Sequence, residues 1–118
     1  MSGATSYHAG LCAEDAVAQV YVRRGRRIVS RRWRGKGGEI DLIVQDGDAL
    51  IFVEVKKSRS HGRAAQSLSR RQMDRISMAA SEFLGTQPRG QLTDVRFDLA
   101  TVNGTGEIAI LENAFQEF

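Results

Sequence analysis

Residues 38–57 read GEIDLIVQDGDALIFVEVKK. Two segments rich in Ile, Leu and Val, Glu39–Gln45 and Leu50–Lys56, flank the turn-forming sequence Asp46-Gly47-Asp48. Two such segments around a short Asp-Gly loop are typical of a β-hairpin. We therefore predict a pair of adjacent antiparallel strands here.

The hairpin also predicts where its polar side chains lie, because side chains alternate between the two faces of a strand. Glu54 and Lys56 share one face of the second strand, while Ile40, Leu42 and Val44 share a face of the first and leave Asp41 opposite. With a two- or four-residue loop, Asp41 lies directly or diagonally across from Glu54 on the same face. A three-residue loop would place them on opposite faces.

Two neighbouring carboxylates repel each other, and the single charge of Lys56 does not neutralise both. A divalent cation would, since Mg²⁺ or Mn²⁺ commonly takes one or two protein carboxylates and fills its other positions with water and substrate phosphate. Such an ion activates water and stabilises charge on a reacting phosphate. We predict Asp41 and Glu54 as its ligands and Lys56 beside the attacking water. The alternative is an exposed Glu-Lys pair, which contributes little.

A helix is predicted from Ala9 or Leu11 to Arg24, with Gly25 placed to end it. At 100° per residue, Glu14 lies about 60° from Val17, the centre of the apolar face, and Asp15 about 160° away. Asp15 should therefore face solvent. Glu14 should lie at the edge of the buried face, as a further metal ligand or, equally well, in a surface salt bridge.

The remaining segments predict an α-β-β-β-α-β-β order, an α+β or mixed α/β sheet with helices on its faces. We expect a strand over Arg26–Trp33, a polar loop over Ser58–Gln66, and strands at Val95–Ala100 and Ile108–Leu111. The second helix begins at a capping box of Ser69 and Gln72. Its predicted buried stripe is Met73, Ile76, Ala80, Phe83 and Leu84.

Length and composition predict one globular domain over residues 1–118, because 42% of the residues are hydrophobic and only one is proline. No run approaches the roughly 18 apolar residues of a membrane span, and no signal peptide is evident. One cysteine and two histidines cannot build a Cys/His zinc site. A cytoplasmic location is expected.

The basic residues are concentrated in two stretches, Arg23–Lys36 without an acid and Lys56–Arg75 with only Asp74. Arginine dominates them, and its planar fork suits phosphate. This favours nucleic acid as the partner over a merely solvated basic surface. The candidate nucleic-acid contacts are Arg23, Arg24, Arg26, Arg27, Arg31, Arg32, Arg34, Lys36, Lys57, Arg59, Arg70, Arg71 and Gln72.

Four other side chains carry simpler expectations. Trp33 should pack in the core or at a sheet edge rather than stack on a base, and His61 should be an exposed loop histidine. Asp98 shares a strand face with Arg96, which predicts a structural pair. Phe115, together with Phe118, could cover the core or form a homodimer contact.

Residues Gly38–Ile43 and Phe52–Lys56 resemble the D…E-x-K signature of the restriction-endonuclease-like PD-(D/E)XK nucleases. Nearly the whole chain resembles the YraN-like bacterial family of predicted endonucleases. Further matching residues are Ala13–Asp15, Trp33–Arg34, Val95–Asp98 and Asn113–Phe115. The chain departs from the family pattern at Arg32, Lys57 and Arg71, none of which is a core acid.

This resemblance implies an αβββαβ core in which helices flank a central mixed sheet. It also implies Asp41 and Glu54 as metal ligands, Lys56 as the catalytic lysine and Glu14 as the helix acid. The expected function is therefore a Mg²⁺- or Mn²⁺-dependent endonuclease that hydrolyses DNA, extended to branched or junction DNA by superfamily analogy. The alternatives are a non-catalytic nucleic-acid-binding module on a nuclease scaffold and, more weakly, a protein-interaction domain.

Overall fold

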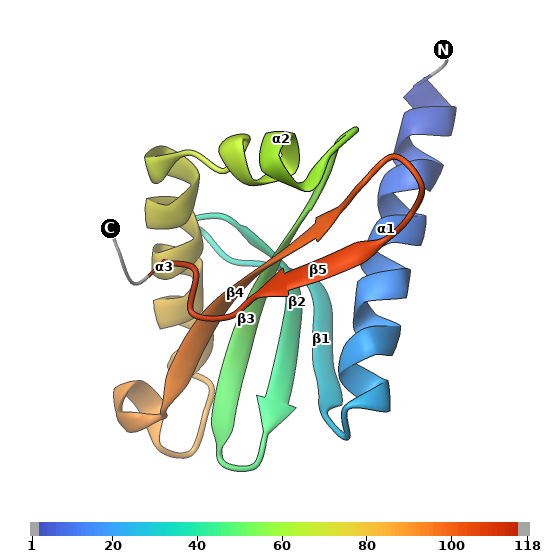
Figure 1. Ribbon diagram of the computed structural model, residues 1–118. Helices are drawn as coiled ribbons and strands as arrows, with labels where there is room; N and C mark the ends of the chain where they lie inside the picture. The colour runs from blue at the N-terminus through green and yellow to red at the C-terminus, as the bar shows by residue number, and fades with distance from the viewer. Residues whose placement is uncertain (1–2, 116–118) are drawn as a thin grey trace.

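The computed structural model describes the backbone of residues 3–115 and the side chains of residues 12–115. Its elements, labelled in Figure 1, follow the predicted order with additions between β3 and β4. In chain order they are α1 (Gly3–Arg23), β1 (Arg27–Arg34), β2 (Glu39–Asp46), β3 (Ala49–Lys57), α2 (His61–Gln66), α3 (Arg70–Leu84), the 3₁₀ helix η1 (Gly90–Leu92), β4 (Val95–Val102) and β5 (Ile108–Leu111).

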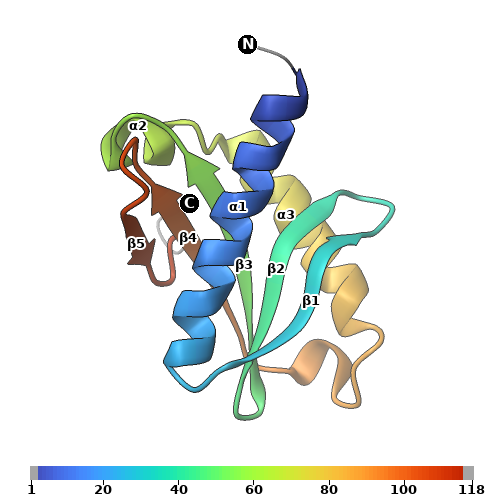
Figure 2. The same cartoon turned by 90° about the vertical axis from the view of Figure 1, so that its right-hand side faces the viewer.

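The five strands form one mixed sheet in the order β1-β2-β3-β4-β5. Neighbours are antiparallel except β3 and β4, which are parallel and joined by the crossover through α2 and α3. Helix α1 covers one face of the sheet and α3 the other (Figures 1 and 2). The predicted mixed α/β fold with flanking helices is confirmed.

Each face of the sheet has its own apolar core, as the alternation in β3 requires. Ile51 and Val53 pack with α1, whereas Leu50 and Phe52 pack with α3. All five residues of the predicted stripe on α3 are buried. The ring of Trp33 lies edge-on to a phenylalanine of α3, which confirms its packing role.

The end of the described chain closes the α3-side core. The ring of Phe115 stacks on that of Phe97, with 4.9 Å between the ring centroids. Phe115 therefore covers the core, which was one of the two roles expected for it. Phe118 lies outside the described residues.

The hairpin has the predicted register. Asp46 pairs with Ala49 and Leu42 with Val53, so the loop is the two residues Gly47 and Asp48. Gly47 has a φ of +61°, a left-handed conformation that favours glycine. The capping box at the start of α3 is also present, with both of its hydrogen bonds.

Two boundaries differ from the sequence prediction. Helix α1 begins at Gly3, earlier than Ala9 or Leu11. The segment 58–66, expected to be a loop, contains α2, which is capped by Ser60 and packs Ala64 completely out of solvent. So short a helix depends on such tertiary contact, which local sequence does not reveal.

His61 is correspondingly half-buried at the start of α2, and its Nδ1 lies 2.7 Å from Oγ1 of Thr101 on β4. The expectation of an exposed loop histidine was wrong. Among the described helices, none is both long enough and apolar enough to cross a membrane.

Candidate active site

The candidate site lies where β2 and β3 separate. Their ladder ends at the pair Leu42–Val53. Beyond it, β2 pairs only with β1, through Ile40 and Glu39, while β3 continues along β4 to Lys57. The separation opens the sheet next to the residues predicted to be functional.

Asp41 stands at this separation. Its Oδ2 accepts a hydrogen bond of 2.8 Å from the backbone N–H of Val55, the residue after Glu54. Asp41 and Glu54 are neighbours, as predicted. They are not a regular ladder pair, however, because the side chain of Asp41 contacts β3 beyond the end of the ladder. The same departure turns Ile40 into the α3-side core, whereas Leu42 and Val44 pack on the α1 side. The prediction that all three share a face was wrong for Ile40.

Glu54 and Lys56 lie side by side on β3. The side chain of Glu54 is 11% exposed, and its Oε2 lies 3.3 Å from Nζ of Lys56. Burial raises the pKa of the Glu54 carboxyl well above its usual range, and the hydrogen bond and charge of Asp41 raise it further. Lys56 opposes this shift without cancelling it. Charge on both acids is therefore unfavourable without a further cation, which would stabilise the ionised form of Glu54.

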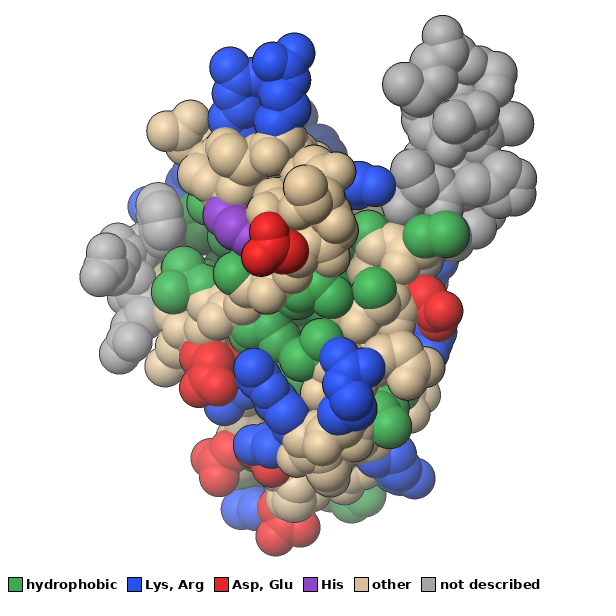
Figure 3. Space-filling view, turned by 45° about the vertical axis from the view of Figure 1, so that its right-hand side comes forward, with side chains coloured by type: hydrophobic (Ala, Val, Ile, Leu, Met, Phe, Trp, Pro, Cys, Tyr) green, Lys and Arg blue, Asp and Glu red, His purple; other side chains and the backbone are tan. Residues whose placement is uncertain are grey.

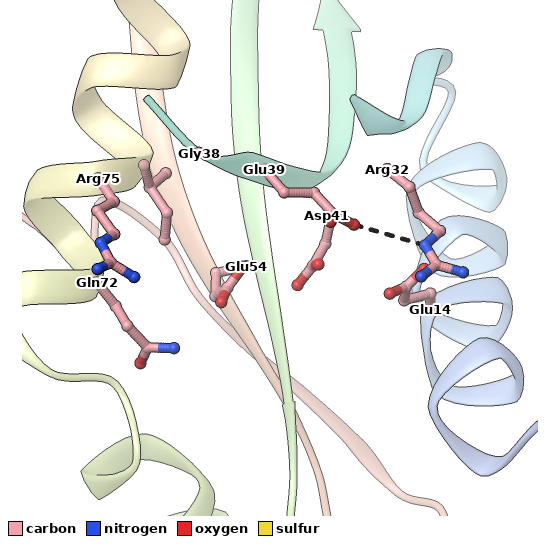
Figure 4. A pocket seen from close by; sticks show the side chains of 9 residues that line it. Glu14, Arg32, Gly38, Glu39, Asp41, Glu54, Gln72 and Arg75 are labelled. Carbon is pink, nitrogen blue, oxygen red and sulfur yellow. Dashed lines mark ion pairs between the residues drawn. The ribbon is translucent and has the colours of Figure 1, made fainter. Parts of the chain in front are cut away.

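These carboxylates open into a pocket of about 360 Å³. Figure 4 shows Asp41 and Glu54 in its middle, Glu14 entering from α1 on one side, and Gln72 and Arg75 from α3 on the other. Residues of α1, β1, the β2–β3 hairpin and α3 therefore line one recess.

Glu14 is half-buried at the edge of this pocket, as its helical angle predicted, and Asp15 is exposed. Burial raises the pKa of Glu14 and nearby Asp41 adds to the shift, while Arg32 lowers it. Within the described part of the chain, no three His, Cys, Asp or Glu side chains come together as a metal-binding group. The role of Glu14 as a third ligand stays a prediction.

Arg32 approaches the same pocket from β1, with a φ of +52° that marks an irregular strand. Its Nε lies 3.5 Å from a carboxylate oxygen of Glu39, and Arg34 pairs with the other oxygen at 3.2 Å. Arg31 similarly pairs with Asp15 of α1 at 2.8 Å. The first basic stretch lacks acids in sequence, but acids from α1 and β2 partly neutralise it in space.

The first basic stretch also divides between the two ends of β1. Arg26 pairs with Asp46 and Arg27 lies opposite Gln45, next to the hairpin turn. This is about 13 Å along the strand from Asp41, at about 3.3 Å per residue. Arg23 and Arg24, at the end of α1, belong to this distant group. Only Arg31, Arg32, Arg34 and Lys36 of the first stretch lie toward the pocket.

The second basic stretch follows the pocket end of β3 into α2 and α3. Lys57, Arg59, Arg70 and Arg71 are exposed there, with Arg70 also 3.8 Å from Asp74. Figure 3 shows basic side chains at the top of the molecule, over α2, and a separate group near the bottom, with acidic side chains among them. The candidate nucleic-acid contacts therefore do not form one continuous surface, because Arg23, Arg24, Arg26 and Arg27 lie far from the others.

Two charged residues of the pocket, Glu39 and Arg75, are not among the predicted site residues. Arg75 follows Gln72 by three residues, which places both on the same face of a helix. That spacing was the available signal. Gly38, at the entry to β2, lies against this turn of α3, because a Cβ atom there would be 3.3 Å from the carbonyl oxygen of Arg75.

A further missed residue, Glu82 of α3, holds the loop between β1 and β2. Its two carboxylate oxygens accept the backbone N–H groups of Lys36 (2.9 Å) and Gly37 (2.7 Å). A Cβ at Gly35 would approach Glu82 and the Trp33 ring to within 2.8 Å. The glycine-rich loop is therefore needed for close packing on α3.

The predicted pair of Arg96 and Asp98 is confirmed and belongs to a larger buried network. The carboxylate of Asp98, which is fully buried, accepts bonds of 2.8 and 2.9 Å from the Arg96 guanidinium. It also accepts the hydroxyl of Tyr21 on α1 (2.8 Å) and the backbone N–H of Asn113 (3.1 Å). This network joins α1, β4 and the C-terminal segment.

The donor set fits a hard divalent cation. One oxygen of Asp41 accepts the N–H of Val55, and the Asp41 carboxylate also lies against Glu54, which supplies a second carboxylate. Mg²⁺ prefers one or two protein carboxylates completed by water and phosphate, so two acids in a polar recess are sufficient. Asp41 and Glu54 would hold such an ion.

Fold and site together define a mixed α/β domain with an acidic pocket at the separation of two central strands. Residues 13–102 match the sequence model described as "Uncharacterised protein family UPF0102". The chain belongs to the UPF0102 family. The resemblance to YraN-like proteins is confirmed at the level of this family.

Individual relatives are similar over almost the full chain. A UPF0102 protein of Cereibacter sphaeroides strain KD131 is 63% identical, covering 98% of each chain. A UPF0102 protein of Ruegeria pomeroyi is 56% identical over 96% of this chain and 92% of its own. A UPF0102 protein of Dinoroseobacter shibae is 47% identical over 94% and 83%.

Proposed function

We propose that the protein is a metal-dependent nuclease that hydrolyses phosphodiester bonds in DNA. The observation that carries this proposal is that Asp41 and Glu54 line one recess, with Lys56 beside Glu54. Two carboxylates with a lysine 3.3 Å from one of them combine a cation site with a group for an anionic reactant. The extension to branched or junction DNA rests on superfamily analogy alone.

The charge of the pocket supports a cation and a phosphodiester together. Four carboxylates line the pocket against two arginines, which leaves two net negative charges when all are ionised. A divalent cation would offset this charge and let an anionic phosphodiester approach. The acids are Glu14, Glu39, Asp41 and Glu54, and the arginines are Arg32 and Arg75.

The bound ion would supply Lewis-acid stabilisation of the phosphate and a water of lowered pKa. Asp41 and Glu54 would orient it, with Asp41 itself fixed by the N–H of Val55. Lys56, held beside Glu54, would hold the attacking water or the developing negative charge. Glu14 lies across the pocket from α3 and would accept a hydrogen bond from water on that side.

Cleavage of labelled single-stranded, duplex, flap and four-way-junction DNA tests this function, in Mg²⁺, Mn²⁺ or EDTA. Asp41→Ala and Glu54→Gln should each lower the rate by at least 100-fold, while Asp48→Ala, which removes an exposed acid in the hairpin turn, should not. Metal-dependent products that persist in both site variants would contradict the proposal.

The alternative is a nucleic-acid-binding module without catalysis. The exposed basic side chains of α2 and the start of α3 favour it. It predicts binding that weakens steeply with salt, and no cleavage with any metal. Binding by the wild-type protein without metal-dependent products would select this alternative.

A further inference from the structure

The two sides of the pocket have opposite hydrogen-bonding character. Asp41 and Glu54 offer only acceptors when ionised, whereas Gln72 and Arg75 line the facing side on α3. We propose that Gln72 and Arg75 together bind the non-bridging oxygens of the phosphodiester that is cut. This inference rests on the proposed nuclease function and assigns the residues that hold its substrate.

The capping box determines which end of the Gln72 amide faces the pocket. Its Oε1 accepts a hydrogen bond of 3.3 Å from the backbone N–H of Ser69, while the backbone N–H of Gln72 donates to the Ser69 hydroxyl at 3.1 Å. The amide oxygen is therefore used within the helix cap. The amide NH₂ group, which can only donate, remains for a ligand.

Arg75 lies one helical turn further along the same side of α3. Among the described residues its guanidinium makes no ion pair, in contrast to Arg32 on the opposite wall, which pairs with Glu39. Its five N–H donors suit a phosphate, which accepts two parallel hydrogen bonds from such a fork. Gly38 packs against the backbone of Arg75 and fixes this turn beside β2.

One ligand can satisfy both the carboxylates on one side of the pocket and the hydrogen-bond donors of Gln72 and Arg75 on the other. A cation belongs beside the carboxylates, and an anion bound to that cation belongs beside Gln72 and Arg75. A volume of about 360 Å³ holds roughly a dozen waters at about 30 Å³ each, enough for a phosphodiester and a hydrated cation. The chemical class that satisfies both sides is a metal-bound phosphodiester.

Gln72→Glu separates this role from a structural one. Glutamate at this position makes the same capping box, so the unfolding midpoint should be unchanged or higher. The donor is nevertheless replaced by a charged acceptor. Affinity for DNA should therefore fall at least 10-fold while affinity for Mn²⁺, measured without DNA, rises.

Arg75→Ala should weaken DNA binding about 10- to 100-fold, the usual range for a lost charge-assisted hydrogen bond. Mn²⁺ affinity should not fall, because Arg75 is not a ligand. Arg75→Lys should recover part of the loss, since it keeps the charge but not the fork. The matched control is Arg89→Ala, an exposed arginine beyond the other end of α3.

The probe is a fluorescein-labelled single strand of DNA, with Ca²⁺ in place of Mg²⁺ to prevent cleavage, and its anisotropy reports binding. Unchanged affinity and cleavage in both Gln72→Glu and Arg75→Ala, with wild-type protein active, would overturn this inference and leave the nuclease intact. Wild-type protein that binds DNA in Ca²⁺ but cuts none in Mg²⁺ or Mn²⁺ would overturn the nuclease function, and the same binding series would still test the two residues. Wild-type protein that neither binds nor cuts would overturn both.

Discussion

Tyr21→Phe isolates one bond of the buried network that joins α1 to β4. Both partners are out of solvent, with Tyr21 1% and Asp98 0% exposed. The substitution removes the 2.8 Å hydroxyl bond to Asp98 and leaves no cavity beyond one oxygen atom. A hydrogen bond to a charged group is worth about 1.5–3 kcal/mol, and we expect the free energy of unfolding to fall by that amount.

For a chain of this length the entropy of unfolding is about 0.25 kcal/mol/K, at about 2.1 cal/mol/K per residue. The expected loss therefore lowers the midpoint by about 6–12 °C. Asp98→Asn should cost more, about 3–5 kcal/mol, because it removes the buried counter-charge of Arg96 and leaves only the more exposed Glu112, 3.6 Å away. The control is Asp15→Asn, which removes an exposed ion pair and should cost under about 1 kcal/mol.

Urea denaturation followed by circular dichroism measures these differences, and an unchanged m-value would show that the unfolded state is unaffected. The network also adds a pH dependence. Burial and Asp98 raise the pKa of the Tyr21 hydroxyl above its usual value of about 10, so only the unfolded state releases this proton above pH 10. Wild-type stability should therefore fall faster than that of Tyr21→Phe above pH 10. Equal stability of both proteins at pH 7 would refute the reasoning.

Three further measurements follow from the site and its supports. Mg²⁺ at ten times its dissociation constant should stabilise the wild-type protein by about 1.4 kcal/mol, but not Glu54→Gln, and an equal shift in both would remove Glu54 from the ligand set. Gly35→Ala should cost about 1–3 kcal/mol because its Cβ meets the Trp33 ring, whereas Gly62→Ala, in open space within α2, should stabilise by about 0.5–1 kcal/mol; denaturation midpoints would check both. Arg59→Ala should reduce the magnitude of the salt slope of DNA binding by about 0.7–0.9, while Arg26→Ala, already paired with Asp46, should leave it unchanged, as binding titrations over a salt series would show.

Local sequence was sufficient to predict most of the helices and strands and the pairing of β2 with β3. The Asp-Gly loop predicted the register of β2 and β3, and the capping box predicted the start of α3. Both depend on residues within a few positions of each other, so the responsible interactions can be read directly. The short helix α2 is the counterexample, because its burial against the sheet depends on strands from elsewhere in the chain.

The sequence predicted which residues make up the candidate site but not how their side chains are arranged. Alternation identified Asp41, Glu54 and Lys56, and helical angle identified Glu14. Neither showed that β2 leaves β3 at Leu42, so that Asp41 bonds to the N–H of Val55. The separation is a property of the whole sheet, because beyond this point β2 stays paired with β1 and β3 with β4.

The sequence by itself determined which side chains share a face wherever the strand is regular, because periodicity is local geometry, and it failed at Ile40, where β2 leaves β3. Only the tertiary structure decided which charged and polar groups of different elements meet. It paired Arg31 with Asp15, and joined Tyr21 to Asp98 across 77 residues. It also moved one group of arginines to the far end of the sheet from the pocket. Electrostatic interactions act through space, so their partners are set by the folded arrangement and not by separation along the chain.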